Sequence, residues 1–145
     1  MRYFLDVEFN GFGGELISLA LVPEAMDAAP FYEAVACETP TPWVAEHVLP
    51  VLRTTPISRS AISLRFAEYL GDDEYPVLVA DWPEDIAHAA MVMVVAPGQR
   101  VALDRISFEM MDPLGFDAAS LSKVPHNAYY DALALRDYVL AHERR

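Results

Sequence analysis

Two acidic residues interrupt the first apolar segment of the chain, and a cluster of glycines follows that segment directly. Residues 3–9 read YFLDVEF, residues 10–14 read NGFGG, and residues 15–22 read ELISLALV. A glycine-rich turn between two such apolar segments is typical of a β-hairpin. Within the first strand, Asp6 and Glu8 point to one face, about 7 Å apart along the chain. Buried carboxylates are unfavourable unless they are paired, so either this strand is an exposed edge or its acids meet partners from elsewhere in the chain.

The segments after this hairpin first add a strand and then alternate between helix and strand patterns. The expected elements are a strand at residues 31–37, helices at 43–52 and 58–70, a buried strand at 77–80, a helix at 83–93, a strand within 101–110, and a helix at 127–142. Three successive strands predict an antiparallel meander, and the later alternation predicts parallel crossover units. No linker or repeat divides the chain, so we expect one α/β domain over residues 1–145, with a mixed sheet flanked by helices.

The composition favours a protein with a full hydrophobic core and no membrane association. The chain has 145 residues, of which 54% are apolar. Its longest apolar run, residues 89–97, is much shorter than a membrane span. No basic segment followed by an apolar one opens the sequence, and the single cysteine, Cys37, excludes an intrachain disulfide framework. We therefore expect a cytoplasmic protein.

The net charge of −12 limits how the chain can bind a nucleic acid. Affinity for phosphates comes from Lys and Arg, so broad coating of a nucleic-acid backbone is not expected. A nuclease with this charge has to attract its substrate through bound cations and a local basic patch. The best candidates for such a patch surround the second helix, namely Arg53, Arg59 and Arg65. The alternative is that these three arginines belong to a solvated helix surface.

A second group of acids follows the buried strand at residues 77–80. Asp81 comes directly after this strand, and Asp85 lies in the first turn of the helix that begins at Pro83. Carboxyl ends of strands are where open α/β sheets bind ligands, which favours a functional site. Acids in a first helical turn also interact favourably with the helix dipole, and that structural role is the alternative.

The third candidate position lies at the start of the last helix. Asn127 is a good N-cap, which places His126 just outside the helix and Asp131 in its first turns. Asp131 shares one helical stripe with the apolar residues Ala128, Ala132, Leu135 and Val139. The carboxylate of Asp131 therefore lies on the face that packs inward. A surface histidine and an acid at the helix dipole are the alternative interpretation.

Taken together, these acids favour a site for divalent metal ions. Carboxylates without a cysteine cluster and with only four histidines in the chain suit Mg²⁺ or Mn²⁺, whereas zinc sites use more nitrogen or sulfur ligands. Two such ions about 4 Å apart can clamp the attacking and leaving oxygens in phosphoryl transfer. A histidine with a pKa near neutrality can accept the proton of the attacking water.

Two sequence segments resemble motifs of the DEDD exonuclease superfamily. FLDVEF, followed by the glycine turn and ELISLALV, is similar to the first motif, and HNAYYDALAL is similar to the third motif in its histidine version, DEDDh. In that version the histidine precedes the last aspartate by five positions, as His126 precedes Asp131. The order and spacing cover nearly the whole chain and look closest to the compact stand-alone exoribonuclease branch, with oligoribonuclease and RNase T more distant. The resemblance implies an RNase H-like fold and a two-metal 3′–5′ exonuclease.

The resemblance also implies roles for individual residues. Asp6, Glu8 and Asp131 would be metal ligands, and His126 would be the general base. The aspartate of the second motif would be Asp85, which lies in the first helical turn. Its alternative is Asp81 at the strand end. The cofactors would be two divalent ions, Mg²⁺ or Mn²⁺.

The residues after the first strand are candidates for substrate contacts. Phe9, Asn10 and Phe12 are placed to stack on the terminal base or contact the terminal sugar, although packing of the turn is an equal alternative. The expected substrate is single-stranded RNA, a 3′ overhang or a short oligoribonucleotide. The alternatives are a DNA-directed, proofreading-type exonuclease and a non-catalytic RNase H-like binding module. The resemblance is also compatible with a homodimer.

Overall fold

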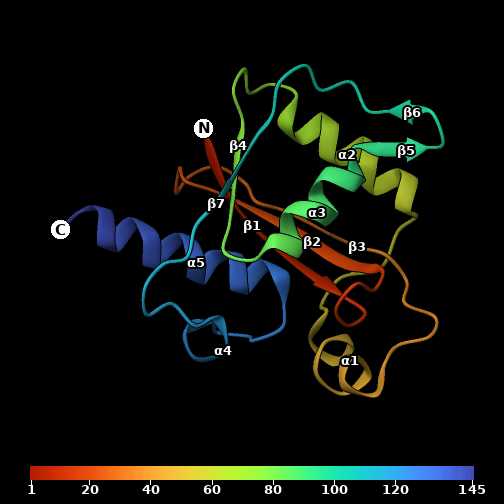
Figure 1. Ribbon diagram of the computed structural model, residues 1–145, viewed down its shortest axis with the longest axis horizontal. Helices are drawn as coiled ribbons and strands as arrows, with labels where there is room; N and C mark the ends of the chain where they lie inside the picture. The colour runs from red at the N-terminus through yellow and green to blue at the C-terminus, as the bar shows by residue number, and fades with distance from the viewer.

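A five-stranded mixed sheet forms the centre of the computed structural model, which describes residues 1–145 (Figure 1). Its strands are β1 (Arg2–Phe9), β2 (Leu16–Pro23), β3 (Phe31–Ala34), β4 (Val77–Ala80) and β7 (Ser107–Met110). They lie side by side in the order β3-β2-β1-β4-β7. Strands β1, β2 and β3 pair antiparallel, whereas β4 pairs parallel to both β1 and β7. The predicted hairpin, meander and parallel strands are confirmed.

Helices cover both faces of this sheet (Figure 1). The helical elements are α1 (Pro42–His47), a 3₁₀ turn at Leu49–Val51, α2 (Arg59–Leu70), α3 (Pro83–Val92), α4 (Ala118–Leu121) and α5 (Ala128–Glu143). Helices α2 and α3 pack on one face, and α5 packs on the other. A small second sheet is formed by β5 (Val94–Ala96) and β6 (Gln99–Arg100). None of the helices has the length and apolar character needed to cross a membrane.

The alternation of side chains along β1 decides which layer each residue enters. Tyr3, Leu5 and Val7 join the large core cluster beneath α2 and α3. Phe4 faces the opposite way and packs with residues of α5. Asp6 therefore continues the α5 face of the sheet, because residues two apart on a strand share a face. The two acids of β1 are held between the sheet and the start of α5.

Some short elements differ from the expectation. The single helix predicted at residues 43–52 is split into α1 and a 3₁₀ turn, because Pro50 lacks an N–H and crowds the preceding helical turn. The third strand ends at Ala34 rather than at residue 37. Cys37 therefore lies beyond the strand, half-buried against the cluster formed by Ile17, Val44 and Val48. The β5–β6 pair and α4 have no counterpart among the predicted elements, since each is too short to show a periodic pattern.

Candidate active site

Strand β1 carries its two acids into the middle of the sheet rather than to an edge. It lies between β2 and β4, so the exposed-edge alternative for Asp6 and Glu8 is wrong. The pairing with β2 shifts register between Glu8 and Phe9, where Ile17 of β2 is the extra residue of a bulge opposite the carboxyl end of β1. Bulges bend a strand and redirect its side chains, and they are frequent beside active sites. The acids thus sit at the end of the sheet where parallel strands bind ligands.

The first group of converging carboxylates joins β1 to the start of α3. Asp6, Asp81 and Asp85 each offer one oxygen, and these atoms all lie within 4.8 Å of one another. Asp81 comes from the end of β4, and Asp85 comes from the first turn of α3 with only 3% of its surface exposed. Both candidates for the second-motif aspartate therefore reach Asp6, and their distances do not separate them.

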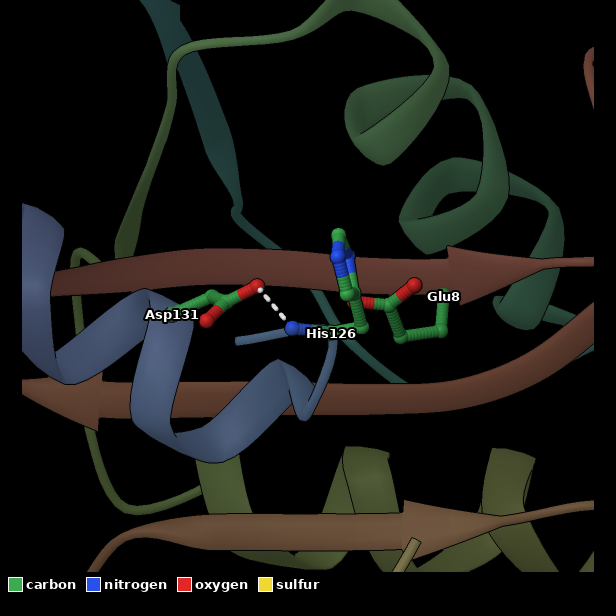
Figure 2. Close-up of side chains that lie close together, drawn as sticks. All are labelled: Glu8, His126 and Asp131. Carbon is green, nitrogen blue, oxygen red and sulfur yellow. Dashed lines mark hydrogen bonds between the residues drawn. The ribbon is translucent and has the colours of Figure 1, made fainter. Parts of the chain in front are cut away.

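The second group joins β1 to the start of α5. Glu8, His126 and Asp131 each offer one ligand atom, and these atoms also lie within 4.8 Å of one another. Figure 2 shows Glu8 on β1 and Asp131 on α5, on either side of His126. Asp131 is 6% exposed, and its Oδ2 accepts a hydrogen bond of 3.1 Å from the backbone N–H of His126. Asp131 thus lies on the buried face of α5, as the helical stripe of apolar residues predicts.

His126 adopts a left-handed backbone conformation, with φ at 68°. For a residue with a side chain this conformation costs about 1–2 kcal/mol, so the surroundings must hold it. Asn127 does so from the next position. Its Oδ1 caps α5 by accepting the N–H of Tyr129 at 3.0 Å, and its Nδ2 donates to the carbonyl of Val51 at 2.8 Å. The α5 N-terminus is thereby tied to the segment that follows α1.

In the absence of cations, the carboxylates of both groups have raised pKa values. Burial raises the pKa of Glu8 to about 8, and the neighbouring charge of Asp131 adds to that shift. Burial and the charge of Asp81 raise the pKa of Asp85 to about 8. Burial also raises the pKa of Asp131 to about 6. For Asp6, burial and the charges of Asp85 and Glu8 shift the pKa well upward.

Two carboxylate oxygens of the site are buried without any hydrogen-bond partner. They are Oδ2 of Asp6 and Oδ1 of Asp131, one from each group. An unpaired buried oxygen of this kind is unfavourable, and no Lys or Arg forms an ion pair with any acid of the site. A hard divalent cation in each group would satisfy these oxygens and remove the repulsion between carboxylates. The donor set therefore fits Mg²⁺ or Mn²⁺.

Helix α1 supplies two aromatic rings beside His126, and no local sequence pattern predicts this contact. The ring of Trp43 meets the His126 ring edge-on at 4.9 Å between centroids. His47 stacks on Trp43 at 4.7 Å, one helical turn later. Burial lowers the pKa of His126, and the charge of His47 lowers it further. The imidazole of His126 is thus favoured in the neutral form, which can accept a proton.

Two hollows flank the carboxylates. The carboxylate cleft has a volume of about 540 Å³. Its lining includes the three acids of the first group and three aromatic residues, namely Asp6, Asp81, Asp85, Phe12, Trp82 and Phe116. The aromatic pocket, about 430 Å³, is lined by Val7, Glu8, Phe9, Gly11, Phe12, Thr41 and Trp43. Phe12 belongs to both hollows and is 85% exposed. An exposed aromatic ring between two hollows is placed to stack on a planar group bound there.

The glycine turn that carries Phe12 is fixed at both ends. The Asn10 amide donates to the carbonyl of Thr39 at 2.9 Å and accepts the N–H of Thr41 at 2.9 Å. The N–H of Gly13 donates to Glu84 at 2.8 Å. Asn10 therefore uses its polar groups within the protein and positions the turn. Phe9, the third predicted contact residue, is half-buried and lines both hollows.

The three arginines predicted to surround α2 differ in their contacts. Arg65 forms an ion pair with Glu33 at 2.7 Å. Arg59 donates to Ser63 at 2.7 Å and to the carbonyl of Met91 at 2.8 Å. Arg53 forms no hydrogen bond or ion pair, and its guanidinium lies 5.7 Å from the centre of the Tyr130 ring. Only Arg53 therefore keeps its donors free.

Comparison with known proteins assigns no family to the chain. No protein-family model matches it, and no curated protein matches it either. Its function is therefore inferred from the sequence motifs and from the geometry of the site.

Proposed function

We propose that the protein is a metal-dependent 3′–5′ exonuclease that hydrolyses phosphodiester bonds at the 3′ end of RNA or short oligoribonucleotides. One observation carries the proposal: acids from β1, the β4–α3 junction and α5 converge on one end of the sheet, together with a histidine. They form two groups, and within each group the ligand atoms lie within 4.8 Å of one another. Each group also contains a buried oxygen that lacks a partner.

The architecture supports an RNase H-like fold. An antiparallel meander of β3, β2 and β1 continues into the parallel strands β4 and β7, in that spatial order. The motif resemblance concerns β1 and the start of α5, which are the two elements that face each other across the site. Fold and motifs thus favour the same class of enzyme, although a fold alone does not specify an activity.

The proposed metal ligands follow the two groups. Asp6 and Asp85 hold one Mg²⁺ or Mn²⁺ ion, with Asp81 as the alternative to Asp85, and Glu8 and Asp131 contribute to the other. When bound, these ions supply positive charge that stabilises the attacking and leaving oxygens of the reaction. Burial and the neighbouring carboxylates raise the pKa values of Glu8 and Asp85 to about 8, and a bound cation would offset both effects.

His126 is the proposed general base. Burial and His47 lower its pKa, so the neutral ring is available near pH 7 to take a proton from the attacking water. The backbone N–H of His126 donates a hydrogen bond to Asp131, which positions the histidine relative to the carboxylates. Trp43 packs against the ring and restricts its rotation.

The aromatic pocket is the proposed site for the terminal base. Phe9, Phe12 and Trp43 line it beside Glu8, so a base stacked there brings its own phosphodiester near the acids. Such stacking tolerates any base sequence and contributes roughly 1–3 kcal/mol per base. The net charge of −12 disfavours long nucleic acids, so short or weakly held ends are the expected substrates.

The test is shortening of a 5′-labelled single-stranded oligonucleotide by the purified protein. With Mn²⁺ we expect a ladder of products that lose one nucleotide at a time from the 3′ end, and with EDTA no shortening. RNA and DNA versions of one sequence separate the favoured substrate from the DNA-directed alternative, because only the 2′-hydroxyl differs at the end. If neither oligonucleotide is shortened in the presence of metal, the proposed exonuclease activity is contradicted. The alternative of a non-catalytic RNase H-like binding module is then favoured.

A further inference from the structure

Few cationic side chains of this acidic protein are free to meet a phosphate. The chain has ten Lys and Arg residues. Those held by ion pairs or hydrogen bonds are Arg2, Arg59, Arg65, Arg105, Arg136 and Arg144. The side chains with neither kind of contact are Arg53, Arg100, Lys123 and Arg145. Figure 1 shows that β6, which carries Arg100, and the C-terminus, which carries Arg145, lie apart from the start of α5.

The other two free cations flank the start of α5. Lys123 is the only lysine of the chain and lies three residues before His126. Arg53 directly follows the residues whose carbonyls accept hydrogen bonds from Asn127, at 2.8 Å for Val51 and 3.3 Å for Leu52. Both cations are thus attached to the structure that positions His126 and Asp131.

Tyr130 lies close to both of these cations. The guanidinium of Arg53 lies over its ring, 5.7 Å from the centre. On another side, Tyr130 and Lys123 line one small pocket with Asp137, whose carboxylate is bound by Arg136 at 2.8 Å. The one acid that lines this pocket therefore already has a cationic partner. Arg53, Lys123 and Tyr130 form what we call the cationic patch.

The backbone of Arg53 is strained in a way that orients this side chain. Arg53 and His126 are the two non-glycine residues with positive φ, at 54° and 68°. Both adjoin the hydrogen bonds of Asn127. A residue with a side chain keeps such a conformation only where the surroundings impose it, and these sites are often functional. Here the conformation directs an exposed guanidinium toward Tyr130, beside the helix that carries Asp131.

We propose that the cationic patch binds the backbone of single-stranded RNA upstream of the 3′ end that enters the site. Two unpaired cations that share an aromatic neighbour suit phosphates and a stacked base, as in grooves that track single strands. The inference rests on the proposed function, since it assigns the 3′ end to the aromatic pocket. It predicts that the patch affects binding of longer strands and leaves cleavage of a dinucleotide unchanged, because the proposal assigns the patch to nucleotides upstream of the last two.

The test compares two double variants with the same loss of positive charge. Arg53→Gln with Lys123→Gln removes the patch, and Arg100→Gln with Arg145→Gln removes the two free cations elsewhere. Binding is measured by the fluorescence anisotropy of a 5′-labelled RNA of about twelve nucleotides, in EDTA so that no metal-dependent cleavage occurs. We expect the patch variant to weaken binding roughly tenfold. The slope of log K against log salt concentration should become shallower by about 0.7 for each lost phosphate contact. We expect the control variant to change binding less than about twofold.

Cleavage kinetics separate this inference from the proposed function. With Mn²⁺, the patch variant should raise KM for the longer RNA and keep the kcat and KM of the unmodified protein for a dinucleotide. Equal binding by the patch and control variants, or no RNA binding by the unmodified protein, would overturn the inference. Absence of nuclease activity in every protein would instead overturn the proposed function, while the comparison of binding would still decide whether the patch exists.

Discussion

At the scale of single residues, Phe12 is the most exposed aromatic side chain of the protein. It is 85% exposed, yet its turn is fixed by hydrogen bonds from Asn10 and from Gly13. An exposed aromatic side chain on a rigid turn adds little to the stability of the folded protein. Its position on the boundary of the two hollows is explained if the ring contacts substrate.

Replacing Phe12 by alanine should therefore weaken substrate use without weakening the fold. We expect kcat/KM on a short oligoribonucleotide to fall by roughly 10-fold or more, the equivalent of losing a base stack. The free energy of unfolding in urea should change by less than about 0.5 kcal/mol. Leu64→Ala, which truncates another exposed apolar side chain on α2, is the matched control. An unchanged kcat/KM for Phe12→Ala would remove this residue from the proposed substrate site.

The choice between Asp85 and Asp81 is also a question about single residues. Asp85 is the more buried of the two, and its pKa is raised to about 8. A carboxyl group whose pKa is so far from its ordinary range is a candidate for a functional role. We expect Asp85→Asn to lower kcat by at least about 100-fold, and Asp81→Asn to lower it by less. A fully active Asp85→Asn protein with an inactive Asp81→Asn protein would transfer the ligand role to Asp81.

At the scale of elements, the start of α5 carries most of the site. Asn127 caps the helix and binds the carbonyl of Val51, so one side chain joins α5 to the segment after α1. His126 precedes this cap, and Asp131 follows it. Any change that loosens the cap is expected to disturb both side chains together.

Two substitutions of Asn127 separate its two functions. Asn127→Ala removes the cap and the link and should lower the free energy of unfolding by roughly 2–3 kcal/mol. Asn127→Ser keeps an oxygen that can cap α5 but loses the donor to Val51, so we expect a smaller loss of stability than for Asn127→Ala. Urea unfolding followed by circular dichroism measures both. Equal stability of the two variants would mean that the cap contributes nothing.

The elements differ in how far the sequence predicts them. The β1–β2 hairpin and α5 are predictable because glycine turns, apolar runs and an Asn cap are local signals. Helix α4 and the β5–β6 pair are not, since two to four residues show no period and owe their conformation to tertiary contacts. Pro50 shows the limit within a predicted helix. This proline ends the α-helix, but the helical spacing of Val44, Val48 and Val51 on either side of it predicts a continuous helix.

At the scale of the whole molecule, the site is a concentration of negative charge in a protein of net charge −12. The acids of the site come from positions more than a hundred residues apart in sequence, from Asp6 to Asp131. Sequence alone indicates each acid through its place at a strand or helix end. It does not predict the contacts from α1, because Trp43 and His47 approach His126 only through the tertiary fold.

This charge concentration predicts how stability depends on pH. The pKa values of Glu8 and Asp85 are raised to about 8 in the folded protein, whereas ordinary carboxyl groups titrate near 4. Between about pH 4 and pH 8 the folded state therefore binds more protons than the unfolded state, so stability falls as pH rises through this window. We expect the unfolding temperature of the metal-free protein to drop by roughly 5 °C or more between pH 5 and pH 8.

Metal ions should reverse this loss. Mn²⁺ binds the deprotonated carboxylates, so it should raise the unfolding temperature more at pH 8 than at pH 5. A double variant, Asp6→Asn with Asp131→Asn, is expected to lose most of this metal-dependent increase. Asp27→Asn replaces an exposed acid outside the site and serves as the control. If Mn²⁺ leaves the unfolding temperature of the unmodified protein unchanged at pH 8, the metal site is contradicted.

The central claim is that the converging acids and His126 hydrolyse nucleic acid from its 3′ end. The most direct measurement compares the unmodified protein with Asp131→Asn and Asp137→Asn in the shortening of a 5′-labelled RNA with Mn²⁺. Both substitutions remove one negative charge from α5, but only Asp131 belongs to the site. We predict stepwise shortening by the unmodified protein and by Asp137→Asn, and a loss of at least about 1,000-fold for Asp131→Asn. Equal activity of the two variants, or no shortening by any of the three proteins, would contradict the claim.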